Sequence, residues 1–397
     1  MPVSTNIQTV AGSRRIAAFC AAFALGLASL LAWGPARAIE TAASHALILD
    51  AETGAVLLEK NADVLMPPAS MSKLMTLLMV YERLRNGSLS LNDTFPVSEN
   101  AWKKGGAKSG GSTMFLNPFE KVRVEDLIRG IAIQSGNDAC IVLAEGLSGS
   151  EEAFARAMTA RAREMGLRSS TFRNSTGLPD PQHLTTAHDL ALLAKHIIQN
   201  YPEYYHYDSE KYFTYNGIRQ GNRNPLIYRD LGADGLKTGH TDESGYGLTA
   251  SAVRNGRRLI MVLNGLPTLK ARAAESETLI EWGFREFDNF ALLQAGEKVA
   301  DAEVWLGEEQ TVPLILKSPL TVTLPRKSRP GMKVTVVYNG PISAPIAIDA
   351  PIAKLVVTAP DTKTIELPLV AGREVEKLGL FGRLAAALKA VIWGHQA

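Results

Sequence analysis

Two kinds of hydrophobic pattern alternate along this chain. In the first, apolar residues recur every three or four positions, the spacing that places them on one face of a helix. The segments with this spacing are 71–85, 124–133, 139–147, 151–165, 187–199 and 269–287. In the second, short aliphatic and β-branched runs lie between turn residues, which predicts strands. The chain therefore combines helices with strands.

The strand-like runs of the first 290 residues form two hairpins. One joins 45–50 to 55–59 around a turn at 51–54, and the other joins 246–253 to 258–264. The second contains Asn255 and Gly256 at its turn, and Asn-Gly is a strong hairpin signal. Most helical segments fall between the two hairpins, so helices are inserted between strands.

The composition changes after about residue 289, where every periodic run is short and lies between Pro or Gly residues. These runs are 304–306, 311–316, 320–324, 333–338, 346–348, 355–358 and 364–367. They predict a small all-β domain. A length of 397 residues also exceeds what one hydrophobic core usually organises, so we expect two domains.

The N-terminus has the features of an export signal. Arg14 and Arg15 precede the uncharged, mostly apolar run 16–33, and Ala36 and Ala38 form the small-x-small site that signal peptidase cleaves. Cleavage would leave Ile39 as the first residue, and the alternative is that the run remains as a membrane anchor. Cleavage would also remove Cys20 and leave Cys140 without a disulfide partner, as a small core residue.

The C-terminal segment 373–393 mixes large apolar residues with Arg373, Lys377, Arg383 and Lys389. The charges interrupt it too often for a membrane span. The mixture predicts an amphipathic helix in the membrane interface, with its basic residues near anionic head groups. The alternative is a helix docked on the all-β domain. The net charge of the whole chain is only +2 and its basic residues are scattered, which argues against binding of nucleic acid.

The first candidate for chemistry is the pair Ser70 and Lys73. Two prolines precede Ser70, so it lies at or near a helix N-terminus, and both residues share the face that carries Leu74, Leu77 and Tyr81. Burial lowers the pKa of a lysine, and a neutral amine three residues away can take the proton of a serine hydroxyl. The alternative is that Ser70 caps the helix and Lys73 reaches solvent.

Two further motifs follow. Ser135, Gly136 and Asn137 lie between two helical segments, where taken alone they read as a helix–helix connection. Lys237, Thr238, Gly239 and His240 precede the second hairpin and are expected on a strand with an accessible edge, with a surface turn as the alternative. A peptide could pair with that edge while Lys237 supplies charge and Thr238 a hydroxyl donor.

The three motifs S-x-x-K, S-G-N and K-T-G start 65 and then 102 residues apart. They match the set known from penicillin-binding proteins and β-lactamases, with Gly136 in place of Asp. The sequence resembles the low-molecular-mass, serine-type D-alanyl-D-alanine carboxypeptidases over nearly all of the chain after the signal. Further matching stretches are 133–139, 237–242 and 272–283.

This resemblance implies an α+β fold of the serine β-lactamase and DD-peptidase type, in which helices cover an antiparallel sheet. It implies a signal peptide at 1–38, a catalytic domain at 39–290, an all-β domain at 291–371 and an amphipathic helix at 372–397. It also favours membrane anchoring by that helix, on the periplasmic face of the inner membrane.

The resemblance further implies the catalytic roles. Ser70 would attack the carbonyl of the penultimate D-alanine of a peptidoglycan pentapeptide, with Lys73 as base. The N–H groups of Ser70 and His240 would hold the oxyanion, and Ser135 and Lys237 would relay a proton to the departing D-alanine. β-Lactams would be trapped on Ser70 as covalent inhibitors.

The substrate-binding roles come from the same resemblance. Asn137 would hydrogen-bond the substrate amide, and Gly239 leaves room for the peptide beside the strand. Thr238 and Arg272 would hold the terminal carboxylate. The Gly-rich loop 103–112 is expected beside the substrate, with a plain flexible loop as the alternative. It is not a phosphate-binding loop because Ala107 stands where glycine is required.

No metal or cofactor is implied. His183 and His188 lack the spacing of metal ligands, and Thr186 with Asp189 indicates a helix start. Three other functions are possible from the motifs: a β-lactamase, a peptidoglycan endopeptidase and an inactive cell-wall binding module. A β-lactamase needs a second base, and the nearest candidate, Glu164, lies in a stretch that lacks the Asn of the β-lactamase motif. The complete motifs argue against an inactive module.

Overall fold

The computed structural model of the protein describes residues 5–9, 39–382 and 384. Contacts within the chain divide it into two compact units. The larger unit comprises Arg37–Arg285, and the second comprises Glu286–Ala397 together with Met1–Ala36. We call them the larger unit and the β unit.

The larger unit contains a five-stranded antiparallel sheet in the order β3-β2-β10-β9-β8. Its strands are β2 (His45–Asp50), β3 (Val56–Lys60), β8 (Ala233–Thr241), β9 (Gly245–Arg254) and β10 (Arg257–Leu266). Short strand pairs lie outside it: β4 (Thr94–Pro96) with β5 (Lys121–Arg123), and β6 (Tyr212–Tyr215) with β7 (Ile218–Gly221). The strand β8 is an edge of the main sheet, as its sequence predicts.

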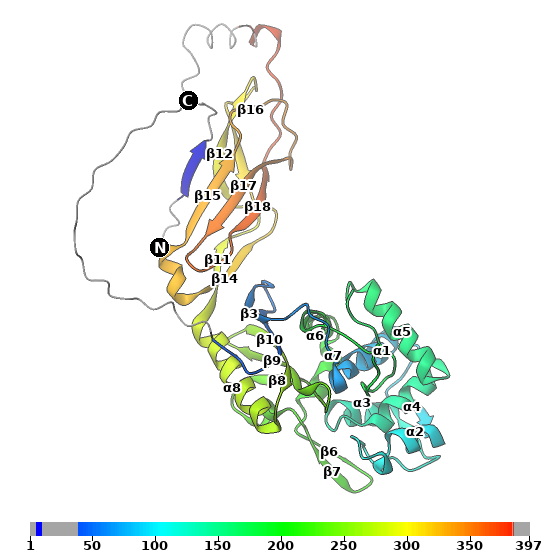
Figure 1. The fold of residues 1–397 in the computed structure, drawn as a ribbon. Coiled ribbons are helices and arrows are strands. Elements are labelled where there is room, and N and C mark those ends of the chain that lie inside the picture. The colour runs from blue at the N-terminus through cyan, green and yellow to red at the C-terminus, as the bar shows by residue number, and fades with distance from the viewer. Residues whose placement is uncertain (1–4, 10–38, 383, 385–397) are drawn as a thin grey trace, which may run out of the picture. The chain divides into compact units, whose positions relative to one another are not determined.

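Helices cover both faces of this sheet (Figure 1). They are α1 (Lys73–Arg85), α2 (Glu99–Gly105), α3 (Val124–Ala132), α4 (Asn137–Ser148), α5 (Glu151–Glu164), α6 (Ala187–Asn200), α7 (Pro202–Tyr205) and α8 (Leu269–Glu286). Short 3₁₀ turns are η1 (Ala69–Ser72), η2 (Ala107–Ser109), η3 (His206–Ser209) and η4 (Pro225–Tyr228).

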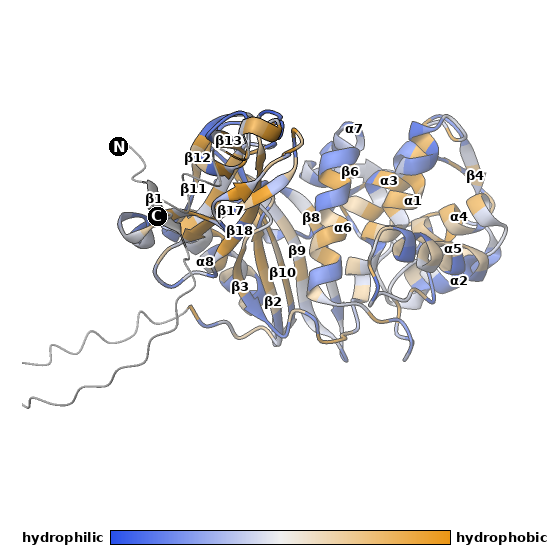
Figure 2. Ribbon diagram, turned by 90° about the horizontal axis from the view of Figure 1, so that it is seen from above, coloured by the Kyte–Doolittle hydropathy of each residue, from blue (hydrophilic) through white to orange (hydrophobic). Residues whose placement is uncertain are grey.

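Successive residues of each strand point to opposite faces, and this alternation separates two cores. On one face Ile48, Met261 and their neighbours pack against Leu279 and Ile280 of α8. On the other face Leu47 and Val262 join the large core formed by the remaining helices. Surface helices such as α6 have an apolar side and a polar side (Figure 2).

The helix α1 is the centre of the larger unit. Every residue from Lys73 to Tyr81 is buried, so the helix is surrounded by protein for more than two turns. A helix in such a position is normally apolar all round, yet this one begins with a lysine. The antiparallel sheet and the helices that cover it confirm the predicted α+β class. The buried Lys73 at the start of α1 marks the site described below.

The predicted helices occur within a few residues of their expected bounds, with one informative shift. The helix predicted from residue 71 starts at Lys73, because the preceding residues form η1. The sequence pattern did not predict α2, the pair β4–β5 or the pair β6–β7. The last contains Asn216 and Gly217, both with positive φ at its turn, which is a hairpin signal that could have revealed it.

The β unit is built almost entirely of strands. They are β11 (Phe287–Leu293), β12 (Lys298–Trp305), β13 (Thr311–Ile315), β14 (Leu320–Pro325), β15 (Lys333–Tyr338), β16 (Ile342–Ser343), β17 (Pro351–Thr358) and β18 (Ile365–Ala371), with η5 (Arg326–Gly331). One sheet has the order β1-β15-β17-β18-β13-β12-β16, where β1 is Thr5–Thr9 near the N-terminus, and β11 pairs with β14. Alternating residues such as Val334 and Val336 fill its core.

Two predictions for the β unit are wrong. The run 346–348 is not a strand: only Ile346 makes a bridge, with Val375, and Ile348 is exposed. That bridge, and a second one between Gly307 and Lys377, hold the chain extended, so a helix cannot begin near residue 373 as predicted. The rest of the predicted amphipathic helix lies largely outside the described residues.

The N-terminal prediction also falls mostly outside the described residues. Within it, β1 (Thr5–Thr9) pairs in parallel with β15. Among the helices that the structure describes, none is both long and apolar enough to cross a membrane.

Candidate active site

The first site residues lie where η1 leads directly into α1. Ser70 is in the 3₁₀ turn, and Lys73 is the first residue of the helix. Because three residues make one turn of a 3₁₀-helix, the two side chains project to the same side. The Lys73 Nζ lies 2.7 Å from the Ser70 Oγ.

Lys73 is fully buried and makes two further contacts. Its Nζ donates to the Asn137 Oδ1 at 2.8 Å and to the main-chain oxygen of Thr176 at 2.7 Å. Burial lowers the pKa of Lys73 to about 8, and the positive charge of Arg223 lowers it as well, against opposing contributions that include Cys140. With such a pKa about one tenth of these lysines are neutral at pH 7, against fewer than about one in a thousand for an ordinary lysine.

Ser135 and Asn137 join the site from the connection between α3 and α4. Ser135 adopts a left-handed backbone conformation with φ +66°, which is uncommon for a residue with a side chain. Its Oγ is buried and finds no hydrogen-bond partner among the described residues. Asn137 is the first residue of α4, and its N–H donates to the Ser112 oxygen at 2.8 Å. Ser135 therefore presents an unused hydroxyl to the cleft it lines.

The edge strand β8 forms the opposite wall. A Cβ on Gly239 would lie 2.9 Å from the main-chain oxygen of Pro68, so only glycine lets this strand approach the turn before Ser70 so closely. Lys237 is fully buried, and its Nζ donates to the Thr238 oxygen at 3.1 Å. Burial, followed by the nearby charge of Lys73, holds the pKa of Lys237 well below its ordinary value.

The cleft between these walls has a volume of about 560 Å³. Its lining includes every predicted site residue except the two lysines: Ser70, Ser135, Asn137, Thr238, Gly239, His240 and Arg272. Lys73 and Lys237 lie behind that surface. The His240 ring stacks on Tyr246 with centroids 3.8 Å apart. The structure thus brings all predicted site residues together.

Two arginines give the cleft its positive charge. Arg272 is buried, its Nε has no partner among the described residues, and burial lowers its pKa to about 10. Arg223 was not predicted; it lines the same cleft and donates to the Ser112 Oγ at 2.5 Å. Among the described residues, no Asp or Glu lines the cleft. Its chemistry therefore suits an anionic group such as a carboxylate.

The Gly-rich loop closes one side, since Gly110, Gly111 and Ser112 line the cleft. Asp138, directly after Asn137, holds the next part of the chain by accepting from the Thr113 Oγ1 at 2.5 Å and from the Met114 N–H at 3.0 Å. The sequence motifs did not single out Asp138. Its distant partners in sequence could not be found from local pattern.

Other residues weighed from the sequence lie apart from this chemistry. Glu164 is exposed and pairs with Arg161 at 3.0 Å. His183 is buried against Phe172, and burial lowers its pKa to about 4, while His188 contacts Asp63 on the surface. Within the described ranges no cluster of three or more His, Cys, Asp or Glu side chains is arranged to hold a metal ion.

Two family models match the chain. Residues 34–268 match the model described as D-alanyl-D-alanine carboxypeptidase. Residues 287–377 match the model of the C-terminal domain of penicillin-binding protein 5.

Individual relatives agree with these matches. The chain is 38% identical to the D-alanyl-D-alanine carboxypeptidase DacC of Escherichia coli over 85% of both chains. It is similar in structure to penicillin-binding protein 5 of Haemophilus influenzae, with a TM-score of 0.75 and 35% identity over 86% of this chain and 99% of that one. Penicillin-binding protein D2 of Listeria monocytogenes, solved in its ampicillin-bound form, covers 62% of this chain and 99% of its own at 32% identity, with a TM-score of 0.54.

Proposed function

The chain belongs to the D-alanyl-D-alanine carboxypeptidase family, a family of serine-type hydrolases, and we propose that Ser70 is the nucleophile with which it removes the terminal D-alanine from peptidoglycan stem peptides. One observation carries this assignment. A fully buried lysine amine lies 2.7 Å from the Ser70 hydroxyl, and burial favours its neutral, basic form. Serine needs such a neighbouring base to become a nucleophile.

Acylation then follows from the positions of the groups. The Ser70 Oγ attacks the carbonyl carbon of the penultimate D-alanine, and its proton passes to the Lys73 Nζ. The oxygen that becomes negative is held by the N–H groups of Ser70 and His240, two residues that line the cleft. The C–N bond breaks, the departing D-alanine takes a proton by way of Ser135 and Lys237, and an ester remains on Ser70.

Deacylation reverses these roles. Water adds to the ester carbonyl, the bond to the Ser70 Oγ breaks, and the serine regains its proton while the shortened peptide leaves. The buried lysines can serve in both directions because their hydrogen-bond partners among the described residues are neutral. Lys73 contacts Ser70, Asn137 and the Thr176 oxygen. Lys237 contacts the Thr238 oxygen. Their charge state is therefore free to change during the cycle.

The preference for a free C-terminus is assigned to Arg272 and Thr238. Arg272 has an unused Nε at the cleft wall, and Thr238 adds a hydroxyl from the edge strand. A terminal carboxylate would meet the donors that the arginine offers. The peptide backbone would pair with β8 while Asn137 donates its side-chain amide to the substrate carbonyl.

The direct test is release of D-alanine from a peptide that ends in D-alanyl-D-alanine. We expect the mature enzyme to release free D-alanine and the Ser70→Ala variant to release none. The same peptide ending in L-alanine is the matched control. Cleavage of cross-linked peptides without release of D-alanine would favour an endopeptidase and contradict the proposal.

We also propose a location for the enzyme. The predicted signal at 1–38 would direct export, and the catalytic domain at 39–290 and all-β domain at 291–371 would then face the periplasm. The part of the tail that follows Leu378 would bind the inner membrane peripherally. The described part of the tail supports this, because Leu380, Phe381 and Leu384 are all exposed large apolar residues.

Deletion of residues 379–397 tests the tail. The apolar residues would bury in the lipid interface, and each basic residue near an anionic surface adds about 1 kcal/mol of attraction. We therefore expect the truncated protein to leave the membrane fraction while release of D-alanine from a short soluble peptide stays within about twofold of the full chain. Sedimentation of the truncated, signal-cleaved protein with membranes would contradict the tether.

A further inference from the structure

The third hydrogen-bond partner of Lys73 is a main-chain oxygen, that of Thr176. It belongs to the loop 174–178, which passes close to the turn that carries the nucleophile: a Cβ on Gly177 would lie 1.9 Å from the Ala69 oxygen. A main-chain acceptor has no rotamer of its own. Its position depends on whatever holds its loop.

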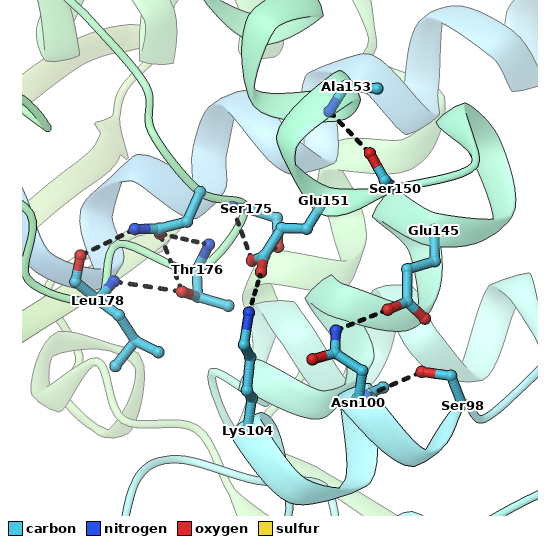
Figure 3. Close-up of polar contacts among 12 residues, drawn as sticks. Ser98, Asn100, Lys104, Glu145, Ser150, Glu151, Ala153, Ser175, Thr176 and Leu178 are labelled. Carbon is cyan, nitrogen blue, oxygen red and sulfur yellow. Dashed lines mark hydrogen bonds and ion pairs between the residues drawn. The ribbon is translucent and has the colours of Figure 1, made fainter.

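A buried carboxylate holds this loop (Figure 3). The Oε1 of Glu151 accepts from the Ser175 N–H at 3.2 Å and from the Ser175 Oγ at 2.8 Å. Glu151 is the first residue of α5, whose start is fixed because the Ser150 hydroxyl accepts from the Ala153 N–H. Its second oxygen faces Lys104 of α2 at 3.7 Å. One side chain thus connects the loop with two helices.

Further hydrogen bonds hold the loop on both sides of the Thr176 carbonyl. The Asn174 Oδ1 accepts from the Thr176 N–H at 3.1 Å and from the Gly177 N–H at 2.7 Å. The oxygen of Ser175 accepts from the Thr76 Oγ1 of α1 at 2.7 Å. The peptide groups on both sides of Thr176 are therefore fixed, and a displacement of Ser175 would carry the Thr176 oxygen with it.

The placement of that oxygen matters because of the chemistry of an amine. An ammonium has three N–H donors, and loss of one proton leaves two donors and one lone pair. The Asn137 Oδ1 and the Thr176 oxygen both accept from Lys73, so they use the two donors. The third direction points to the Ser70 Oγ, which is where a base needs its lone pair.

We propose that Glu151 is a positioning residue: by holding Ser175 it keeps the Thr176 oxygen against Lys73 and so aims the lone pair of the neutral lysine at Ser70. The inference rests on the proposed function of Lys73 as the base. It differs from a purely electrostatic role, in which the negative charge of Glu151 would act on Lys73 together with Cys140 and Asp138 of α4 and with Arg223.

Two substitutions separate these roles. Glu151→Gln removes the charge but keeps an oxygen that can accept from both Ser175 donors, whereas Glu151→Ala removes both. The neighbouring Glu152 is exposed and makes none of these contacts to the loop, so Glu152→Ala is the matched control. The rate at which penicillin acylates Ser70 is measured from pH 5 to pH 10 for each protein, after circular dichroism has shown that it is folded.

Loss of the negative charge disfavours the ammonium form of Lys73, so the rise of the rate with pH should move to lower pH in both Glu151 variants. At high pH, where the lysine is neutral in every protein, Glu151→Gln should stay within about threefold of wild type. The rate of Glu151→Ala should fall by about tenfold to a hundredfold, because the lone pair of Lys73 is then no longer directed at Ser70. Glu152→Ala should match wild type throughout.

A high-pH rate of Glu151→Ala within threefold of wild type would overturn the inference, and so would equal losses in the Gln and Ala variants. If Glu151→Ala does not fold, Ser175→Ala takes its place: it removes one of the two donors to Glu151, and an unchanged high-pH rate would count against the inference. Absence of acylation in the wild type itself would instead contradict the proposed function, so the two failures are distinguishable.

Discussion

The larger unit and the β unit differ in the kinds of side chain that they bury. In the larger unit, charged side chains such as Lys73, Lys237, Asp138 and Asp208 lie in the interior. In the β unit, the buried polar residues among those described are only Thr323 and Ser328, and the interior is otherwise aliphatic with one tyrosine. Both units have dense cores, so packing alone does not distinguish them.

The difference concerns polar groups that lack partners. Buried polar atoms without a described partner include the Ser135 Oγ, the Arg272 Nε and both carboxylate oxygens of Asp208, whereas the β unit contributes the Ser328 Oγ alone. Each such group costs stability. The comparison indicates that the larger unit carries a cost in stability that the β unit largely avoids. Part of that cost falls on Ser135 and Arg272, for which we propose roles with the substrate.

The largest expected effect is that of Lys73→Ala on acylation. Without its base Ser70 is a poor nucleophile, so we expect the rate of penicillin acylation to fall by at least about a thousandfold, which is about 4 kcal/mol of barrier. In the wild type the rate should rise with pH through about 8, because the lysine must lose its proton to act. Circular dichroism should show an unchanged fold.

Retained acylation of a folded Lys73→Ala protein within about tenfold of wild type would mean that another group takes the proton. The buried charge would then be a structural feature, and the contrast between the two units would lose its functional explanation.

Arg272→Ala should have the next largest effect, and one that depends on the substrate. A charge-assisted pair between guanidinium and carboxylate contributes about 1.5–3 kcal/mol, so turnover of a peptide with a free terminal carboxylate should fall by about tenfold to a hundredfold. The same peptide with an amidated terminus should lose much less. Equal losses in kcat/KM on both peptides would show that Arg272 supports the structure of the cleft rather than recognising the carboxylate.

Asp208→Asn should stabilise the protein at high pH. Burial raises the pKa of Asp208 to about 7, so the folded state holds a proton that the unfolded state loses near pH 4. Stability must therefore fall as the pH rises from 4 to 7. The variant has no such proton to lose, and we expect thermal unfolding at pH 8 to show a gain of about 1–3 kcal/mol over wild type.

Thermal unfolding at pH 4 is the comparison within this experiment, because there the wild-type carboxyl is protonated and the gain should shrink. Asp301→Asn is the matched control in the β unit, where Asp301 is exposed and pairs with Lys298 at 3.0 Å. It should change stability little at either pH. A loss of stability in Asp208→Asn at pH 8 would mean that the carboxylate is an effective partner for Lys237.

The sequence was sufficient to predict much of this contrast, because periodicity records which faces are buried. Lys73 stood out since it occupies an apolar face of α1. The short runs after residue 289 predicted an all-β unit, although they missed β11 and β16 and included 346–348. That run failed because Ile348 is exposed and only Ile346 pairs. A short apolar run does not reveal whether a neighbouring strand is within reach.

What the sequence did not reveal are contacts between distant segments. Arg223 lies in an ordinary polar stretch, and only the fold brings it to Ser112. Glu151 reads as a favourable first-turn residue of a helix, and its contact with Ser175 depends on how the loop returns to α5. Motifs identified the reacting groups, whereas the residues that orient them required the tertiary structure.

The central claim is that Ser70 is the nucleophile of this cleft, and mass spectrometry of the protein after incubation with penicillin tests it most directly. We expect the wild type to gain the mass of one penicillin molecule, on the peptide that contains Ser70, and the Ser70→Ala variant to gain none. An adduct on Ser70→Ala, or no adduct on the folded wild type, would contradict the assignment.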